Sequence, residues 1–152
     1  MKLSPILLFV VLLVAPTTFA SNDKPTAQRA WKPFFAGFRR ALKKRDRATL
    51  RTMMSADFFS SGGNSEGADA AFHFWDDPQL RGWDAFDHVL ARGTVAQAAW
   101  WNSGHKSKYI SRVAPPAANI RRNAKRGAVH WYAIFEFRDG HWYCTVFNQC
   151  CD

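Results

Sequence analysis

Residues 128–147 read AVHWYAIFEFRDGHWYCTVF. The dipeptide Asp139-Gly140 separates two runs that are rich in aromatic and β-branched residues. Asp-Gly between runs of this kind is the strongest short sequence signal for a β-hairpin with a two-residue turn. The stretch therefore predicts a hairpin over residues 129–147, and the two faces of this hairpin decide how the rest of the chain packs.

The register of the hairpin follows if Arg138 pairs with His141 across the turn, because side chains alternate between the two faces of a strand. The first face is apolar and should meet the helices; it pairs Phe137 with Trp142, Phe135 with Cys144, Ala133 with Val146 and Trp131 with Asn148. The second face is mixed but aromatic; it pairs Glu136 with Tyr143, Ile134 with Thr145 and Tyr132 with Phe147. Either solvent or a partner covers this second face.

Upstream of the hairpin, apolar residues recur at spacings of three and four, which is typical of one face of a helix. A first helix is predicted over residues 31–44, with Pro33 in its first turn. Its inner face is made of Trp31, Phe34, Phe35, Phe38, Ala41 and Leu42. Asp46 is expected to cap a second helix over residues 46–54.

A third helix is predicted over residues 77–92, because Asp77 and Pro78 have the types that favour a helix cap and the first helical position. Its apolar stripe is Leu80, Trp83, Phe86 and Leu90. Shorter elements are expected as a strand at 57–59, helical turns at 68–75, and strands at 95–101 and 108–113. Helices that precede an antiparallel sheet in the chain predict an α+β fold.

Two stretches resemble a known superfamily. Residues 31–59, WKPFFAGFRRALKKRDRATLRTMMSADFF, resemble the opening helices and first strand of NTF2-like (SnoaL-type) cone domains. Residues 134–147, IFEFRDGHWYCTVF, are similar to the last hairpin of these domains. The resemblance implies a curved antiparallel sheet, ending in a β-hairpin and plugged by N-terminal helices, with a pocket inside the cone. Some members use a pocket Asp as the base of an isomerase or dehydratase, but no position here matches such a motif.

We expect the pocket of this cone to be lined by aromatic residues, namely Trp31, Phe35, Phe38, Trp83, Phe135 and Trp142. Tyr109, Asp57 and Glu136 are further pocket positions. Members of the superfamily commonly pair through a sheet face, so the aromatic strip on the second face of the hairpin is expected to form a homodimer interface. This strip consists of Tyr132, Ile134, Tyr143 and Phe147.

Residues 63–67, GNSEG, match the G-x-S-x-G pattern of the nucleophile elbow in serine hydrolases. The elbow needs a buried strand before the serine and a parallel sheet that holds the partner Asp and His, and the sequence shows neither. We therefore interpret Ser65 as a capping residue for the turn at Ala68. Whether the protein is an enzyme at all is left open by the sequence.

The catalytic candidates are Asp84 and His88, which stand four residues apart on the third predicted helix and can contact each other there. They could do acid–base work if they faced a pocket, but the apolar stripe directs them to a flank of the helix. We therefore interpret them as a solvated pair. The histidines show no metal-ligand spacing, so no metal and no cofactor is expected.

The first 20 residues, MKLSPILLFVVLLVAPTTFA, have the charge, apolar run and small residues of a secretory signal peptide. We expect an exported protein, periplasmic or secreted, that is not an integral membrane protein after cleavage. Residues 21–30 are predicted to be a flexible lead-in, and 31–152 a single domain. The cysteines are Cys144, Cys150 and Cys151, an odd number that indicates a free or interchain thiol in the tail.

Charges are segregated along the chain, whose formal net charge is +9. Residues 24–51 hold ten Lys or Arg against Asp46, whereas residues 57–87 hold seven acids against Arg81. We expect the two segments to pack together and partly neutralise each other. The leading functional prediction is a non-catalytic module that binds a small apolar ligand or serves assembly. The alternatives are an acid–base enzyme of the isomerase or dehydratase kind and a cationic binder of anionic envelope components; no specific nucleic-acid partner is expected.

Overall fold

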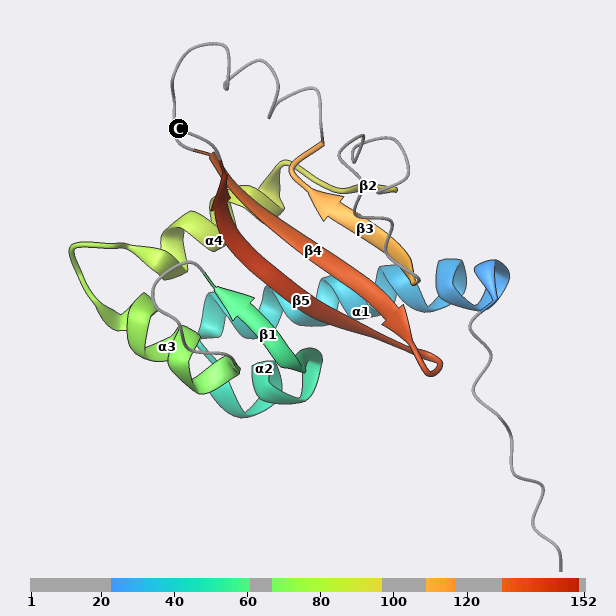
Figure 1. The fold of residues 1–152 in the computed structure, drawn as a ribbon, viewed down its shortest axis with the longest axis horizontal. Helices are drawn as coiled ribbons and strands as arrows, with labels where there is room; N and C mark the ends of the chain where they lie inside the picture. Colours follow the sequence, from blue (N-terminus) through green and yellow to red (C-terminus); the bar gives the residue numbers. More distant parts are fainter. Residues whose placement is uncertain (1–22, 61–66, 97–108, 117–129, 151–152) are drawn as a thin grey trace, which may run out of the picture.

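The computed structural model describes residues 23–60, 67–96, 109–116 and 130–150, and within them helices pack on one face of a five-stranded sheet (Figure 1). The helices are α1 (Lys24–Lys44), α2 (Arg47–Met53), α3 (Ala68–Asp76) and α4 (Gly82–Ala91). The strands are β1 (Met54–Ser60), β2 (Val95–Ala96), β3 (Ile110–Ala114), β4 (His130–Arg138) and β5 (His141–Cys150). The predicted α+β class is confirmed. None of the helices in these four ranges is both long and apolar enough to cross a membrane.

The helix α1 begins earlier than predicted. Asp23 caps it by accepting a 2.7 Å hydrogen bond from the backbone N–H of Thr26, and Pro25 occupies the first turn. Ala27 is buried, and its carbonyl accepts a 2.8 Å hydrogen bond from Trp142 Nε1. Residues 24–30 are therefore ordered helix rather than a flexible lead-in, and Pro33 lies inside the helix rather than in its first turn.

Asp46 caps α2 as predicted, accepting a 3.1 Å hydrogen bond from the backbone N–H of Thr49. The predicted start of the third long helix at Asp77 is wrong. Asp77 instead caps a single turn, in which its side chain accepts a 2.8 Å hydrogen bond from the backbone of Gln79. The helix α4 begins at Gly82, after Arg81 in the left-handed conformation with φ 48°. Leu80 is consequently 41% exposed instead of facing the core.

The late start of α4 has a packing reason. Gly82 is buried against Trp75 of α3, and a Cβ at position 82 would lie 2.6 Å from Trp75 Cδ1. Only glycine permits α3 and α4 to approach this closely. From that contact onwards α4 keeps the predicted pattern, and Trp83, Phe86 and Leu90 are buried.

The sheet order is β1-β5-β4-β3-β2. The pairs β5–β4, β4–β3 and β3–β2 are antiparallel as predicted, whereas β1 joins the edge of β5 in parallel. A parallel pair requires a long connection, and α3, α4 and three strands intervene between β1 and β5. The sheet is therefore mixed, with the one parallel pair at its β1 edge among the described strands.

The hairpin register is confirmed near the turn and wrong beyond it. Phe137 pairs with Trp142 and Phe135 with Cys144, but Ile134 then pairs with Val146, so Thr145 is an extra residue on β5. Such a bulge moves every later side chain of its strand to the other face. The predicted pairs of Ala133 with Val146, Ile134 with Thr145, Tyr132 with Phe147 and Trp131 with Asn148 are replaced by pairs shifted by one residue.

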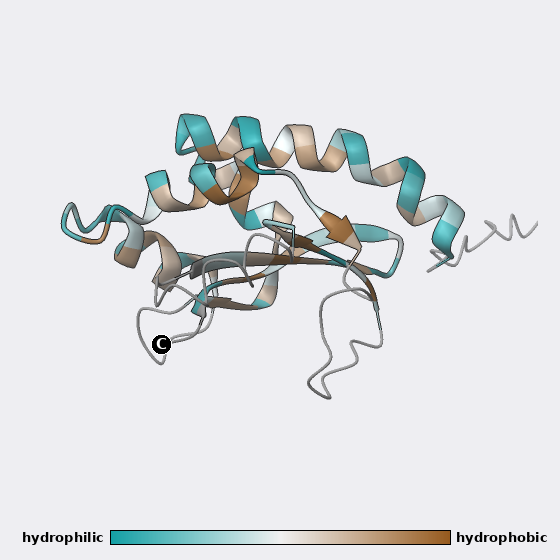
Figure 2. Cartoon of the chain, turned by 90° about the horizontal axis from the view of Figure 1, so that it is seen from above, coloured by the Kyte–Doolittle hydropathy of each residue, from teal (hydrophilic) through white to brown (hydrophobic). Residues whose placement is uncertain are grey.

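The bulge brings Phe147 to the helix side of the sheet. Its ring stacks on Phe86 at a centroid distance of 3.9 Å, and its side chain is fully buried. Val146 moves to the other side, where it packs near Val113, Tyr132 and Ile134. The core is otherwise the expected aromatic layer between α1 and the sheet, and Figure 2 shows α1 lying as a separate layer over the strands.

Candidate functional site

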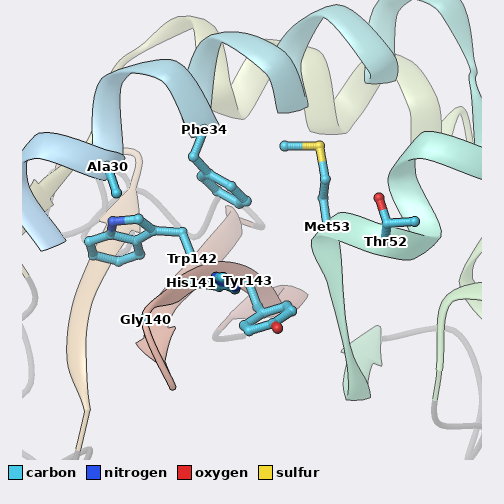
Figure 3. Close-up of a pocket in the computed structure, with 8 residues that line it drawn as sticks. All are labelled: Ala30, Phe34, Thr52, Met53, Gly140, His141, Trp142 and Tyr143. Carbon is cyan, nitrogen blue, oxygen red and sulfur yellow. The ribbon is translucent and has the colours of Figure 1, made fainter. Parts of the chain in front are cut away.

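A space of about 280 Å³ lies between α1, the end of α2 and the start of β5 (Figure 3). Its wall combines one face of α1, the last turn of α2 and the tip of the hairpin. The lining residues are Ala30, Phe34, Thr52, Met53, Gly140, His141, Trp142 and Tyr143. They come from segments far apart in the chain, which only the tertiary fold brings together.

The pocket exists because β5 is longer than its neighbour β1. Pairing between the two strands begins where Met54 lies opposite Cys144. Residues 141–143 therefore extend past the start of β1, and α2 turns into β1 beside them at Met53. The helix α1 closes the space from above, through Ala30 and Phe34 (Figure 3).

The walls of the pocket are mostly apolar. Phe34, Met53 and Trp142 supply ring and thioether surface, and the Trp142 indole N–H is already engaged by the carbonyl of Ala27. The Thr52 hydroxyl donates a 2.8 Å hydrogen bond to the backbone carbonyl of Thr49. His141 and Tyr143 are the titratable residues of the lining, which includes no carboxylate. Such a surface suits a small ligand with an apolar body and one polar end.

Of the six aromatic residues predicted to line a pocket, Trp142 does so. The other five, Trp31, Phe35, Phe38, Trp83 and Phe135, pack in the core, where rings fill the space between α1 and the sheet. Phe135, for example, contacts Trp31 at 5.4 Å and Phe38 at 5.5 Å between ring centroids. Seven lining residues were not predicted as pocket residues, although Phe34 and Met53 were expected on the buried sides of the first two helices. No local signal marks the place where β1 stops short of the hairpin tip.

Asp57, Glu136 and Tyr109 gather around Arg138, on the side of the sheet turned away from the helices. Arg138 donates to Asp57 at 2.8 Å and 3.0 Å and to Glu136 at 2.5 Å and 2.9 Å, and its guanidinium lies 4.8 Å from the centroid of the Tyr109 ring. Burial tends to raise the pKa of Asp57, but the hydrogen bonds and charge of Arg138 outweigh it and hold that pKa below its usual value. This cluster is an ion pair network outside the pocket.

Asp84 and His88 are both exposed on α4. Asp84 forms a 3.0 Å ion pair with Arg81, and His88 Nε2 lies 2.9 Å from a guanidinium nitrogen of Arg92. Neither residue lines the pocket. The structure therefore places them at solvent positions, each beside an arginine.

The strip predicted as a dimer interface is divided by the bulge. Phe147 lies on the helix side, which corrects its predicted face. Tyr132 and Ile134 are each 8% exposed and form a small second cluster with Val113. Tyr143 is half-buried and lines the pocket. The prominent exposed ring on the outer side is Phe59, which is 43% exposed and pairs with Val146 at the sheet edge.

The basic and acidic segments pack together as expected. Arg39 lies 3.9 Å from Asp87, Arg47 lies 2.6 Å from Asp76, and Arg51 pairs with Asp69. These pairs tie α1 and α2 to α3 and α4. All three are at least partly exposed, so each contributes little to stability.

Several sequence expectations fall on other parts of the chain. Ser65, residues 1–22 and Cys151 lie outside the described residues; the N-cap position of α3 is occupied by Gly67. Within the described ranges no group of His, Cys, Asp and Glu could hold a metal. Cys144 is a free, fully buried thiol, and burial raises its pKa well above the usual value. A thiol of this kind is unreactive.

Comparison with known proteins gives a partial likeness to solved structures. No protein-family model matches the sequence, and no curated protein matches it. Among solved structures, a designed NTF2-like protein, a five-substitution variant named Rd1NTF2_05, is similar with a TM-score of 0.37 and 10% identity over 84% of this chain and 100% of that chain. The protein is an α+β domain with helices on one face of an open, mixed five-stranded sheet.

Proposed function

We propose that the protein is an exported NTF2-like domain that binds a small, largely apolar ligand in the pocket between α1, α2 and β5, without acting on it chemically. The observation that carries the proposal is the 280 Å³ space walled by Phe34, Met53 and Trp142. Ligand pockets usually measure about 300–1,000 Å³. The ligand is accordingly small, of the size of one or two rings, with His141 or Tyr143 available for a single polar group.

The chemistry of the carboxylates favours binding over acid–base catalysis. The residues that line the pocket include no Asp or Glu. Asp57 and Glu136 are bound by Arg138, and the pKa of Asp57 is lowered. A carboxylate that serves as a general base near neutral pH needs its pKa raised towards the working pH. The pKa of Asp57 is instead shifted downwards, away from neutral pH.

The test is to fill the pocket. 1-Naphthylamine, an uncharged fluorescent probe of two fused rings, should bind the wild type, and Ala30→Phe should weaken binding at least about tenfold because the new ring occupies the space. The matched control is Ala36→Phe, which adds the same ring to an exposed position of the same helix. Far-ultraviolet circular dichroism shows whether each variant keeps its helices. Equal affinity in the two variants would refute the pocket as the binding site.

Export and pairing are further parts of the proposal. The signal-like segment 1–20 supports export, and fusion of residues 1–20 to alkaline phosphatase lacking its own leader should yield active enzyme outside the cytoplasm; an inactive fusion would refute export.

The exposed Phe59 beside Val146 supports a homodimer through the outer side of the sheet. Phe59→Glu should then shift sedimentation of the mature chain to monomer, whereas Leu80→Glu, at an exposed apolar residue away from the sheet, should leave the dimer intact. A wild type that is monomeric at high concentration would refute the dimer.

A further inference from the structure

Arg112 of β3 points to the helix side of the sheet, where the neighbouring positions are apolar. It lies opposite Phe135 in the β3–β4 pair. Its guanidinium carbon is 4.9 Å from the centroid of the Trp31 ring, and its Nε donates a 3.1 Å hydrogen bond to Thr94 Oγ1. One edge of the guanidinium is thus held in place by a hydroxyl and one face by an indole.

The charge of Arg112 has no carboxylate partner among the described residues. Arg138, in the adjacent strand, contacts both Asp57 and Glu136, whereas the two terminal nitrogens of Arg112 form no hydrogen bond within the described ranges. The sequence that follows β2 and the sequence that follows β3, residues 97–108 and 117–129, contain no Asp or Glu. Burial lowers the pKa of Arg112, which expresses the cost of holding an unpaired cation there.

The surroundings of Arg112 define the chemistry of a ligand. A guanidinium whose two terminal nitrogens form no hydrogen bond to the described residues can bind the two oxygens of a carboxylate. Trp31 is buried and stacks on Phe35 at a centroid distance of 4.9 Å, and Phe35 is partly exposed, which places an aromatic ring near the charge. A single cation balances a single negative charge. We propose that Arg112, with Thr94 and Trp31, forms a second binding site, which takes an aromatic or apolar monocarboxylate.

This site is separate from the pocket. The pocket is lined by Ala30 and Phe34 of α1. The second binding site is instead formed beside Trp31 and Phe35, which follow them by one position and lie on the adjacent side of the same helix. Trp142, at 4.7 Å from Trp31 between ring centroids, stands between them. The proposal therefore holds whether or not the pocket binds its own ligand.

The test compares 2-naphthoate with its uncharged analogue 2-naphthamide, using the ¹H–¹⁵N signal of the Trp31 indole, assigned through Trp31→Phe. The wild type should bind the acid at least about tenfold more tightly than the amide, with a shift of this signal. Arg112→Met should abolish the preference for the acid over the amide. Arg112→Lys should keep part of this preference, because lysine keeps the positive charge but lacks the two parallel N–H groups of the guanidinium. Arg92→Met is the matched control, since it removes the same charge from an exposed position.

Each outcome decides the proposal. No binding of naphthoate by the wild type, equal binding of acid and amide, or an unchanged preference in Arg112→Met would overturn it. The first two of these outcomes are measured on the wild type, so they remain decisive even if Arg112→Met folds poorly. If Arg112 is only structural, its replacement changes thermal stability and leaves the preference unchanged. Loss of naphthoate binding in Ala30→Phe with retention in Arg112→Met would assign the acid to the pocket and refute the second site.

Discussion

The contact between Gly82 and Trp75 predicts a large effect from the smallest possible substitution, Gly82→Ala. The added Cβ would lie 2.6 Å from Trp75 Cδ1, 2.9 Å from Trp75 Cγ and 2.9 Å from Trp75 Cα. Rotation of the Trp75 side chain cannot relieve the last of these contacts, because the Cα belongs to the backbone of α3. The two helices must therefore move apart.

The magnitude follows from what moves with Trp75. Its ring contacts Phe86 at 5.2 Å, Trp83 at 5.0 Å and Phe147 at 5.8 Å between centroids, and it is 1% exposed. Overpacking of a filled core costs about 1–3 kcal/mol. Alanine is favoured over glycine within a helix by up to about 1 kcal/mol, which offsets part of that cost. We expect Gly82→Ala to lower the free energy of unfolding by about 1–2 kcal/mol.

Urea unfolding followed by circular dichroism measures this free energy, and Gly37→Ala is the matched control. A Cβ at position 37 would meet Met53 Cε at 3.6 Å, an ordinary contact. Gly37 lies inside α1, so alanine there should stabilise the protein by about 0.5–1 kcal/mol. The reasoning is refuted if Gly82→Ala is as stable as the wild type, or if both substitutions shift stability in the same direction by the same amount.

Two further substitutions test contacts described above. The pKa of Asp57 is lowered from 3.8 in the folded protein, so its contribution to stability is present above that value and is lost as the pH falls through the lower folded value. Asp57→Asn should accordingly be less stable than the wild type at pH 7, and the difference in the free energy of unfolding should shrink below pH 3.8. If this difference does not depend on pH, the charge of Asp57 is not its cause. Trp142→Phe removes the second hydrogen bond of the Ala27 carbonyl, which as a carbonyl inside α1 keeps its helical bond, and should cost about 0.5–1.5 kcal/mol in urea unfolding. It should also speed amide exchange in the first turns of α1, and unchanged exchange there would show that Trp142 does not anchor this end of the helix.

The sequence predicts those parts of the fold that local chemistry determines. The Asp139-Gly140 turn sets the hairpin register near its tip, and Asp46 caps α2 wherever that helix packs. The Asp23 cap and Pro25 carry the same kind of local signal for the start of α1, which a search for apolar periodicity alone misses. Polar composition at residues 24–30 suggested a lead-in, although an amphipathic helix begins there.

Features that depend on distant partners are not predictable in this way. Thr145 bulges because Phe147 then stacks on Phe86, a residue of α4 about 60 positions earlier in the chain. The pocket depends on where β1 meets β5, and the place of the Arg112 guanidinium over Trp31 depends on which side of β3 faces α1. Each of these is a matter of tertiary assembly, and neither composition nor spacing encodes it visibly.

The position of β4 and β5 after the described helices α1 to α4 has a consequence for biosynthesis. The aromatic rings of α1 and α4 pack on Phe135 and Phe147 only when this hairpin is present, and among the described strands β1 pairs with β5 alone. During translation, the helices thus leave the ribosome before the surface that buries them exists. A nascent chain of this design stays unfolded until its last elements are made, which leaves time for chaperones to bind it.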